Sequence, residues 1–202
     1  MATVDSHVGY RNASDDAGLI AASLEEPEAF ALVYDRHATR LYRYARRRLG
    51  ADVAEDVVAD AMLTAFRKRE HYDTTRPDAR PWLFGILTRE ISRRRRDERA
   101  RFRAITRLGP SGDTDQGAVD QVTAAIAAGA ARGALAEALA ALAVRDRDVL
   151  LLVAWADLSY QEVADALHIP IGTVRSRLNR ARRRVRAVIS AYTDLLDMED
   201  TR

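Results

Sequence analysis

The segment 159–186 restricts the fold more than any other part of the chain. It reads SYQEVADALHIPIGTVRSRLNRARRRVR. Ser159 and Glu162 form an S-x-x-E capping box, which is typical of a helix start. Pro170 excludes a continuous helix through the HIPI stretch, so a tight turn is expected there. The segment therefore predicts two short helices joined by a tight turn, which is a helix-turn-helix.

The second of these helices is expected to begin near Gly172 and to have one apolar face. Val174, Leu178, Ala181 and Val185 recur at helical spacing, so the remaining side chains point outward. In a helix-turn-helix the second helix enters the major groove, where arginine reads guanine and asparagine reads adenine. The side chains expected to contact DNA bases or phosphates are Thr173, Arg175, Ser176, Arg177, Asn179, Arg180 and Arg183.

The formal net charge of the chain is only +2, but its positive charges are concentrated in particular segments. Residues 175–186 contain seven arginines and no acid, and Lys68 is the only lysine of the chain. Arginine pairs bidentately with phosphates and base edges, which suits a nucleic-acid partner. A GC-rich genome would also favour arginine, and any basic amphipathic helix after a turn would look similar. The position of the arginines therefore carries the argument.

The whole chain is predicted to be all-α, with two small helical domains joined by a flexible linker. Helix formers dominate, aromatic residues make up 6% of the chain, and glycine and proline are sparse. The linker candidate is GPSGDTDQG, residues 109–117. The expected organisation is a mobile tail (1–16), a first helical module (17–108), a linker (109–132), a second helical module (133–190) and an acidic tail (191–202).

The first module is expected to contain three main helices. One has Pro27 in its first turn and ends at Gly50, and the next begins at a capping-box-like pair formed by Asp52 and Glu55. A loop over residues 68–81 precedes a long helix that Asp78 caps and that extends to residue 108. This long helix changes from the apolar PWLFGIL to the basic REISRRRRDERARFR.

Three stretches resemble bacterial sigma factors of the extracytoplasmic-function (ECF) type. RDRDVLLLVAWADLSYQEVADALHIPIGTVRSRLNRARRRVR is similar to region 4, AEDVVADAMLTAFR to region 2.2, and RPWLFGILTREISRRRR to the regions that melt and bind the −10 element. The resemblance covers about residues 19–188 in the family's order. It implies a non-catalytic subunit that recruits core RNA polymerase to promoters, reading the −35 element with region 4. His168 stands where the family has a turn glycine, and a left-handed conformation is expected for it.

The resemblance also implies sites in the first module. Opening a promoter requires a protein that captures an extruded base and stacks on single-stranded DNA. The residues expected at the −10 element are His71, Tyr72, Arg76, Trp82, Arg89, Arg93 and Arg94, although Trp82 beside Leu83 and Ile86 also suits a core position. The residues expected to contact the β′ clamp of RNA polymerase are Asp56, Ala59 and Asp60, although a solvated acidic face would look the same. The implied partners are core RNA polymerase (β′ clamp and β flap), promoter DNA and a possible anti-sigma factor.

Other functions find little support in the sequence. The chain has no cysteine, and His7, His37, His71 and His168 show no metal-ligand spacing. We therefore expect no metal site, no cofactor and no catalytic residue, which argues against a nuclease. No export signal or membrane-spanning run is recognised, so a cytoplasmic protein without membrane insertion is expected. A stand-alone helix-turn-helix regulator that binds duplex DNA without polymerase remains the alternative.

Overall fold

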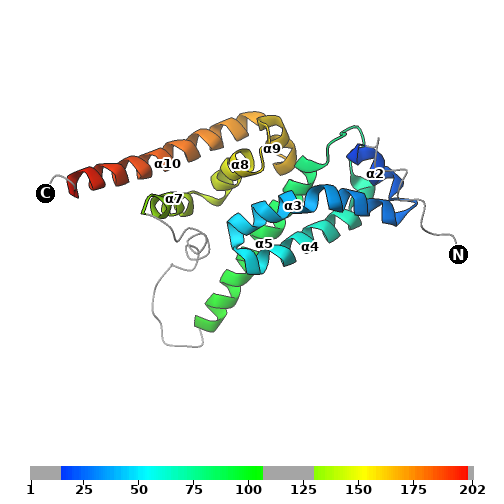
Figure 1. The fold of residues 1–202 in the computed structure, drawn as a ribbon, viewed down its shortest axis with the longest axis horizontal. Coiled ribbons are helices and arrows are strands. Elements are labelled where there is room, and N and C mark those ends of the chain that lie inside the picture. The colour runs from blue at the N-terminus through cyan, green and yellow to red at the C-terminus, as the bar shows by residue number, and fades with distance from the viewer. Residues whose placement is uncertain (1–14, 107–129, 200–202) are drawn as a thin grey trace.

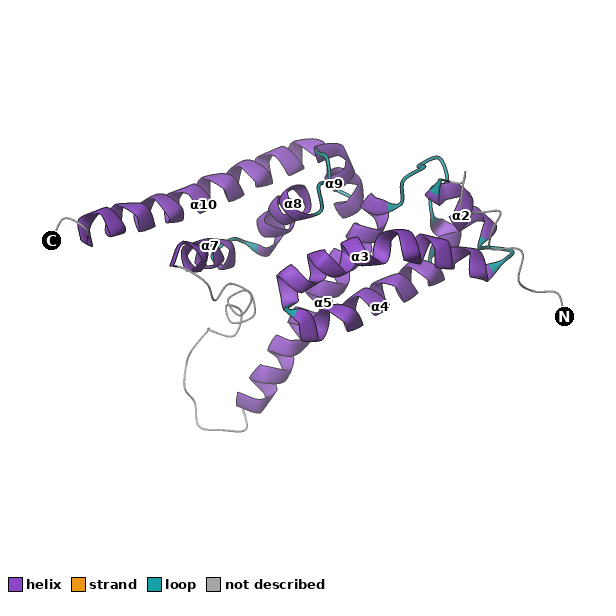
Figure 2. Cartoon of the chain, viewed as in Figure 1, coloured by secondary structure: helices purple, strands orange, loops and turns teal. Residues whose placement is uncertain are grey.

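The computed structural model describes residues 15–106 and 130–199, and every element in these ranges is a helix or a helical turn (Figures 1 and 2). The all-α prediction is confirmed. We call residues 15–106 the N-terminal module and residues 130–199 the C-terminal module. The N-terminal module contains α2 (Asp16–Ala22), η1 (Pro27–Ala29), α3 (Phe30–Leu49), α4 (Ala51–Arg67), η2 (Arg69–His71) and α5 (Arg80–Thr106). The C-terminal module contains α7 (Ala130–Ala140), α8 (Val144–Trp155), α9 (Tyr160–Leu167) and α10 (Ile171–Glu199).

The core of the N-terminal module lies where α3, α4 and the first half of α5 pack together. Each helix buries one apolar stripe, because apolar residues recur every three or four positions. Two aromatic pairs meet edge to face: Tyr44 with Phe84 at 5.3 Å and Phe30 with Phe66 at 5.5 Å between ring centroids. Among the fully buried side chains are Leu19, Ile20, Val33, Leu41, Leu83, Leu87 and Ile91.

Of two helix boundaries predicted in the N-terminal module, the structure confirms one and contradicts the other. Gly50 ends α3 with a φ of 86°, a backbone conformation that glycine adopts without strain, so its prediction as a helix stop is confirmed. The capping box predicted at Asp52 and Glu55 is wrong. Helix α4 already begins at Ala51, with Gly50 at the cap position and no side-chain capping bond. The single glycine serves as the end of one helix and the start of the next.

The outer limits of the modules also differ from the expected boundaries. Helix α7 begins at Ala130, so the last residues of the expected linker (109–132) are helical, whereas residues 107–129 lie outside the described residues. Helix α10 continues to Glu199, so most of the expected acidic tail (191–202) extends this helix. Residues 191–199 contain no glycine or proline to end it. The N-terminal tail (1–16) lies outside the described residues except for Asp15 and Asp16.

The two modules contact each other directly. Helix α9 of the C-terminal module packs against α5 of the N-terminal module, as Figure 1 shows near the start of α5. In residues 15–106 and 130–199, none of the helices has the length and apolarity needed to cross a membrane.

Candidate nucleic-acid interface

The helix-turn-helix predicted from residues 159–186 is confirmed by the geometry of its caps. Ser159 Oγ accepts the amide of Glu162 (3.3 Å), and Glu162 Oε2 accepts the amide of Ser159 (2.7 Å), so both halves of the capping box are formed. His168 follows α9 with φ 52° and ψ 50°, the left-handed conformation expected of it. Pro170 then precedes α10, and its carbonyl accepts the amide of Thr173 (2.8 Å).

The C-terminal module orients α10 through the apolar stripe predicted for it. Val174, Leu178 and Ala181 are almost completely buried, and Val185 is half-buried. They pack with α8, α9 and the connection between these helices, which contribute Val149, Leu152, Leu158 and Val163 to this core. Because one face of α10 is fixed inward, the opposite face is held outward without depending on any polar contact.

The outward face of α10 carries the side chains predicted to contact DNA. Arg175, Ser176, Asn179 and Arg183 are exposed, whereas Thr173 and Arg177 are half-buried. Together with α9 this face forms an open groove of about 470 Å³ lined by Tyr160, Arg175, Leu178, Asn179, Arg182, Arg183 and Arg186. No acid lines the groove, so its electrostatic field suits a polyanion. Contact of these residues with DNA stays a prediction.

Arg180 is placed differently from its neighbours on α10. Its Nε and Nη2 donate to the two carboxylate oxygens of Asp146 on α8 (3.1 and 3.0 Å). These hydrogen bonds raise the pKa of Arg180 above its ordinary value. Arg180 therefore contacts a base only after leaving Asp146. The pair was missed in the sequence because Asp146 reads simply as an acid in the first turn of a helix.

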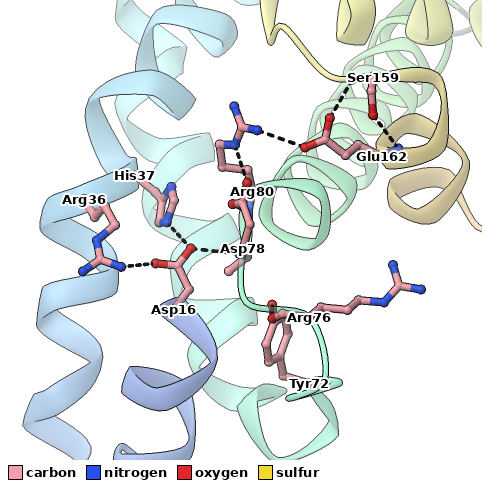
Figure 3. Close-up of polar contacts among 10 residues, drawn as sticks. Asp16, Arg36, His37, Tyr72, Arg76, Asp78, Arg80, Ser159 and Glu162 are labelled. Carbon is pink, nitrogen blue, oxygen red and sulfur yellow. Dashed lines mark hydrogen bonds and ion pairs between the residues drawn. The ribbon is translucent and has the colours of Figure 1, made fainter. Parts of the chain in front are cut away.

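The loop before α5 is fixed by a buried carboxylate that the sequence analysis did not single out. Figure 3 shows Asp16 at the start of α2, where Oδ1 accepts from Arg36 Nη1 (2.6 Å) and Oδ2 lies 2.7 Å from His37 Nε2. Asp16 Oδ2 also accepts the amide of Ala79 (2.8 Å). Burial raises the pKa of Asp16, but the hydrogen bonds from His37 and Ala79 lower it more, to about 2.

The aromatic residues predicted for the −10 element lie partly in the core. Tyr72 is buried, and its hydroxyl donates to the carbonyl of Arg76 (2.6 Å), so the ring supports the loop from inside. Trp82 is half-buried and packs on Tyr72 with 4.9 Å between ring centroids. His71 is exposed, and its Nδ1 lies 3.4 Å from Glu70 Oε1. Base contact by these three residues stays a prediction, and for Tyr72 it would require the ring to leave the core.

The basic stretch of α5 is partly neutralised by acids of its own module. Arg93 Nη2 lies 2.8 Å from Glu90 Oε2 and 3.5 Å from Asp60 Oδ2, and Arg94 Nε donates to Glu98 (3.3 Å). Arg89 is exposed. The structure thus brings a residue predicted for DNA, Arg93, next to one predicted for polymerase, Asp60.

The exposed face of α4 has the composition predicted for a protein contact. Asp56, Ala59 and Asp60 are all exposed, and the neighbouring Leu63 leaves 46% of its surface exposed. Leu63 therefore leaves an apolar side chain exposed beside two acids, and contact of this face with polymerase stays a prediction. In the described residues, no three or more His, Asp or Glu side chains form a group that could hold a metal ion.

The fold and the outward basic helix define a helix-turn-helix protein with a second basic helical module. The sequence matches the family models described as "Sigma-70 region 2" over residues 33–101 and "Sigma-70, region 4" over residues 132–185. It is 38% identical over 176 residues to ECF RNA polymerase sigma factor SigL of Mycobacterium tuberculosis, a match that covers 86% of this chain and 96% of SigL. It is 30% identical over 181 residues to SigK of Mycobacterium ulcerans, covering 88% and 96% of the two chains.

Solved structures agree with this result. A structure of CnrH in complex with the cytosolic domain of CnrY matches with a TM-score of 0.60 and 26% identity, covering 87% of this chain and 97% of the other. The sigma factor RpoE from Bartonella quintana, in complex with the anti-sigma factor NepR, has the same fold with a TM-score of 0.58 and 24% identity, over 81% and 98% of the chains. The chain belongs to the ECF family of RNA polymerase sigma factors.

Proposed function

We propose that this chain binds core RNA polymerase and directs it to selected promoters, with the N-terminal module reading and melting the −10 element and the C-terminal module reading the −35 element. The observation that carries the proposal is the outward face of α10. It is free of acid over residues 171–186, lies on a complete helix-turn-helix, and belongs to the same chain as a second basic module. Sigma factors are generally regulators rather than enzymes, and this chain acts without a catalytic step of its own.

The C-terminal module reads duplex DNA through its groove. Arg175, Asn179 and Arg183 line this groove and meet base edges in the major groove, where each good bidentate pair contributes ~1–3 kcal/mol of discrimination. Thr173 and the first-turn amides of α10 hold a phosphate, and Arg177 adds a phosphate contact. Arg180 joins this surface when DNA phosphate or a base competes successfully with Asp146.

The N-terminal module binds the single strand of the opened promoter. His71, Arg76 and Trp82 form the surface for an extruded base, with Tyr72 supporting the loop from the core. Base stacking on an aromatic side chain contributes ~1–3 kcal/mol per base. The arginines of α5, namely Arg89, Arg93 and Arg94, follow the phosphate backbone.

The proposed protein partners fit the remaining surfaces. Asp56, Ala59 and Asp60, with Leu63 beside them, contact the β′ clamp, and the C-terminal module contacts the β flap. An anti-sigma factor is also proposed, because the structurally similar sigma factor RpoE was solved in complex with the anti-sigma factor NepR. The protein acts in the cytoplasm, where its polymerase resides.

Run-off transcription on fragmented genomic DNA, with core RNA polymerase in the presence and absence of this chain, tests the proposal. Discrete transcripts that require the chain are expected, and their start sites reveal both promoter elements. An absence of such transcripts, together with tight binding of the chain alone to one duplex sequence, would instead support a stand-alone regulator.

A further inference from the structure

The contact between the modules depends on a glycine in the middle of a helix. Gly85 lies in α5, where its backbone faces Ala166 of α9. A Cβ atom added at Gly85 would lie 2.3 Å from the carbonyl oxygen of Ala166, which is closer than atoms approach in proteins. Glycine inside a helix is less favourable than alanine. The close approach of α9 is the structural reason visible for a glycine at this position.

Two ion pairs also join α9 to the start of α5 and the loop before it: Arg76 lies in the loop that the proposed function assigns to the −10 element, and Arg80 is the first residue of α5. Arg80 Nη2 donates to Glu162 Oε1 (2.9 Å), and Arg76 Nη1 lies 2.6 Å from Asp165 Oδ2. Figure 3 shows Arg80 reaching from the N-terminal module to Glu162 beside Ser159. Asp165 thus pairs with the guanidinium group of Arg76, which the proposed function assigns to the −10 element, and a carboxylate competes with a phosphate for such a group.

A buried ion pair forms another contact between the modules. Arg48 of α3 is fully buried and donates through Nη2 to Asp148 of α8 (2.6 Å). Arg95 and Arg147 lie near the same carboxylate, and burial together with the charge of Arg48 lowers the pKa of Arg95 to about 10. Three guanidinium groups around one carboxylate leave excess positive charge, and Arg48 Nε and Arg147 Nε find no hydrogen-bond partner. A buried ion pair of this kind adds little net stability, so this pair contributes little to holding the modules together.

We propose that α9 is an intramolecular competitor of promoter DNA, which holds the chain in a closed state in which the −10 loop is occupied. This inference rests on the proposed function for the assignment of the loop to DNA. In the closed state Arg76 is paired with Asp165 of α9, and Arg80 near it is paired with Glu162, so binding of a strand through Arg76 requires this contact to open. A ligand that binds only the open state has its apparent affinity reduced by the fraction of open molecules, and weakening the closed contact raises that affinity.

Gly85→Ala is the sharpest test, because it changes no charge and should stabilise α5 while preventing the close approach of Ala166. The matched control is Gly133→Ala, since a Cβ at Gly133 in α7 meets nothing within 4 Å. The double variant Glu162→Gln and Asp165→Asn tests the ion pairs separately. Glutamine also serves in a capping box, so α9 keeps its start.

The full-length chain contains no cysteine, so Thr39→Cys and Ser190→Cys give one dye site on each module for energy transfer. Binding of a labelled oligothymidine is measured in parallel by fluorescence anisotropy. We expect Gly85→Ala and the double variant to lower the transfer efficiency and to bind the oligonucleotide about threefold to tenfold more tightly. Gly133→Ala should match the parent chain in both measurements.

Three results would overturn the inference. They are low transfer in the parent chain, unchanged transfer in Gly85→Ala, and opening without tighter oligonucleotide binding. None of these requires polymerase. The run-off assay could fail while energy transfer and oligonucleotide binding change as expected. That result would contradict the sigma function but would still support the closed state.

Discussion

Replacing Asp16 with asparagine should destabilise the N-terminal module in a pH-dependent way. The Asp16 carboxylate is buried, with only 4% of its side-chain surface exposed, and it joins α2 to α3 and to the loop before α5. Asparagine keeps the shape but removes the negative charge from a site that faces Arg36 and His37. The backbone amide of Ala79 loses a charged acceptor in the same step.

The magnitude follows from the pKa of Asp16, which is lowered from 3.8 to about 2 in the folded chain. Each pKa unit corresponds to 1.36 kcal/mol, so the ionised carboxylate contributes roughly 2 to 3 kcal/mol to the free energy of unfolding. Because the folded pKa is the lower one, this contribution is fully present above pH 3.8. It falls to about half near pH 3 and is lost as the pH drops through 2.

Urea unfolding at pH 7 and pH 3 measures the change in the free energy of unfolding. The signal is the fluorescence of Trp82, in a chain that also carries Trp155→Phe. Asp16→Asn should lower the free energy of unfolding by roughly 2 to 3 kcal/mol at pH 7 and by about half that at pH 3. Asp15→Asn is the control, since Asp15 caps α2 through the amide of Gly18 and asparagine caps equally well. A cost below about 0.5 kcal/mol at pH 7, or a cost that does not shrink at pH 3, would refute the reasoning.

Three further predictions concern the C-terminal module. Arg175→Ala should weaken binding at particular −35 bases, whereas Arg184→Ala should weaken binding to all sequences and lower the salt slope by ~1; equal sequence-independent losses in gel-shift titrations would contradict this division. His168→Gly should stabilise the module by about 0.5 to 1 kcal/mol in thermal unfolding because it relieves a left-handed backbone, and a lower melting temperature would oppose this. Leu178→Ala should cost about 2 to 5 kcal/mol in urea unfolding followed by Trp155 fluorescence, because Leu178 is 2% exposed, and a loss under 1 kcal/mol would mean that the stripe of α10 is not core.

The sequence predicted the helices and the helix-turn-helix because these depend on local signals. The capping box at Ser159, the proline in the turn and the periodic apolar residues of α10 act within a few positions of each other. The prediction failed at Asp52, where Gly50 supplied the helix start through its backbone freedom. It also missed Asp16, whose partners lie 20, 21 and 63 positions away along the chain. No periodicity records such pairs, because they depend on which helices meet.

The contact between the modules also depends on which helices meet, so the sequence did not predict it. This contact explains why similar arginines have different surroundings. Arg76 and Arg175 are both arginines that the proposed function assigns to DNA. In the structure Arg76 pairs with Asp165 of the other module, whereas the groove that Arg175 lines contains no acid. The −35 surface is therefore open in the closed state while the −10 loop is occupied. Duplex binding by the C-terminal module should consequently respond little to Gly85→Ala, and single-strand binding should respond strongly. Equal responses of the two would mean that α9 does not act selectively on the −10 loop.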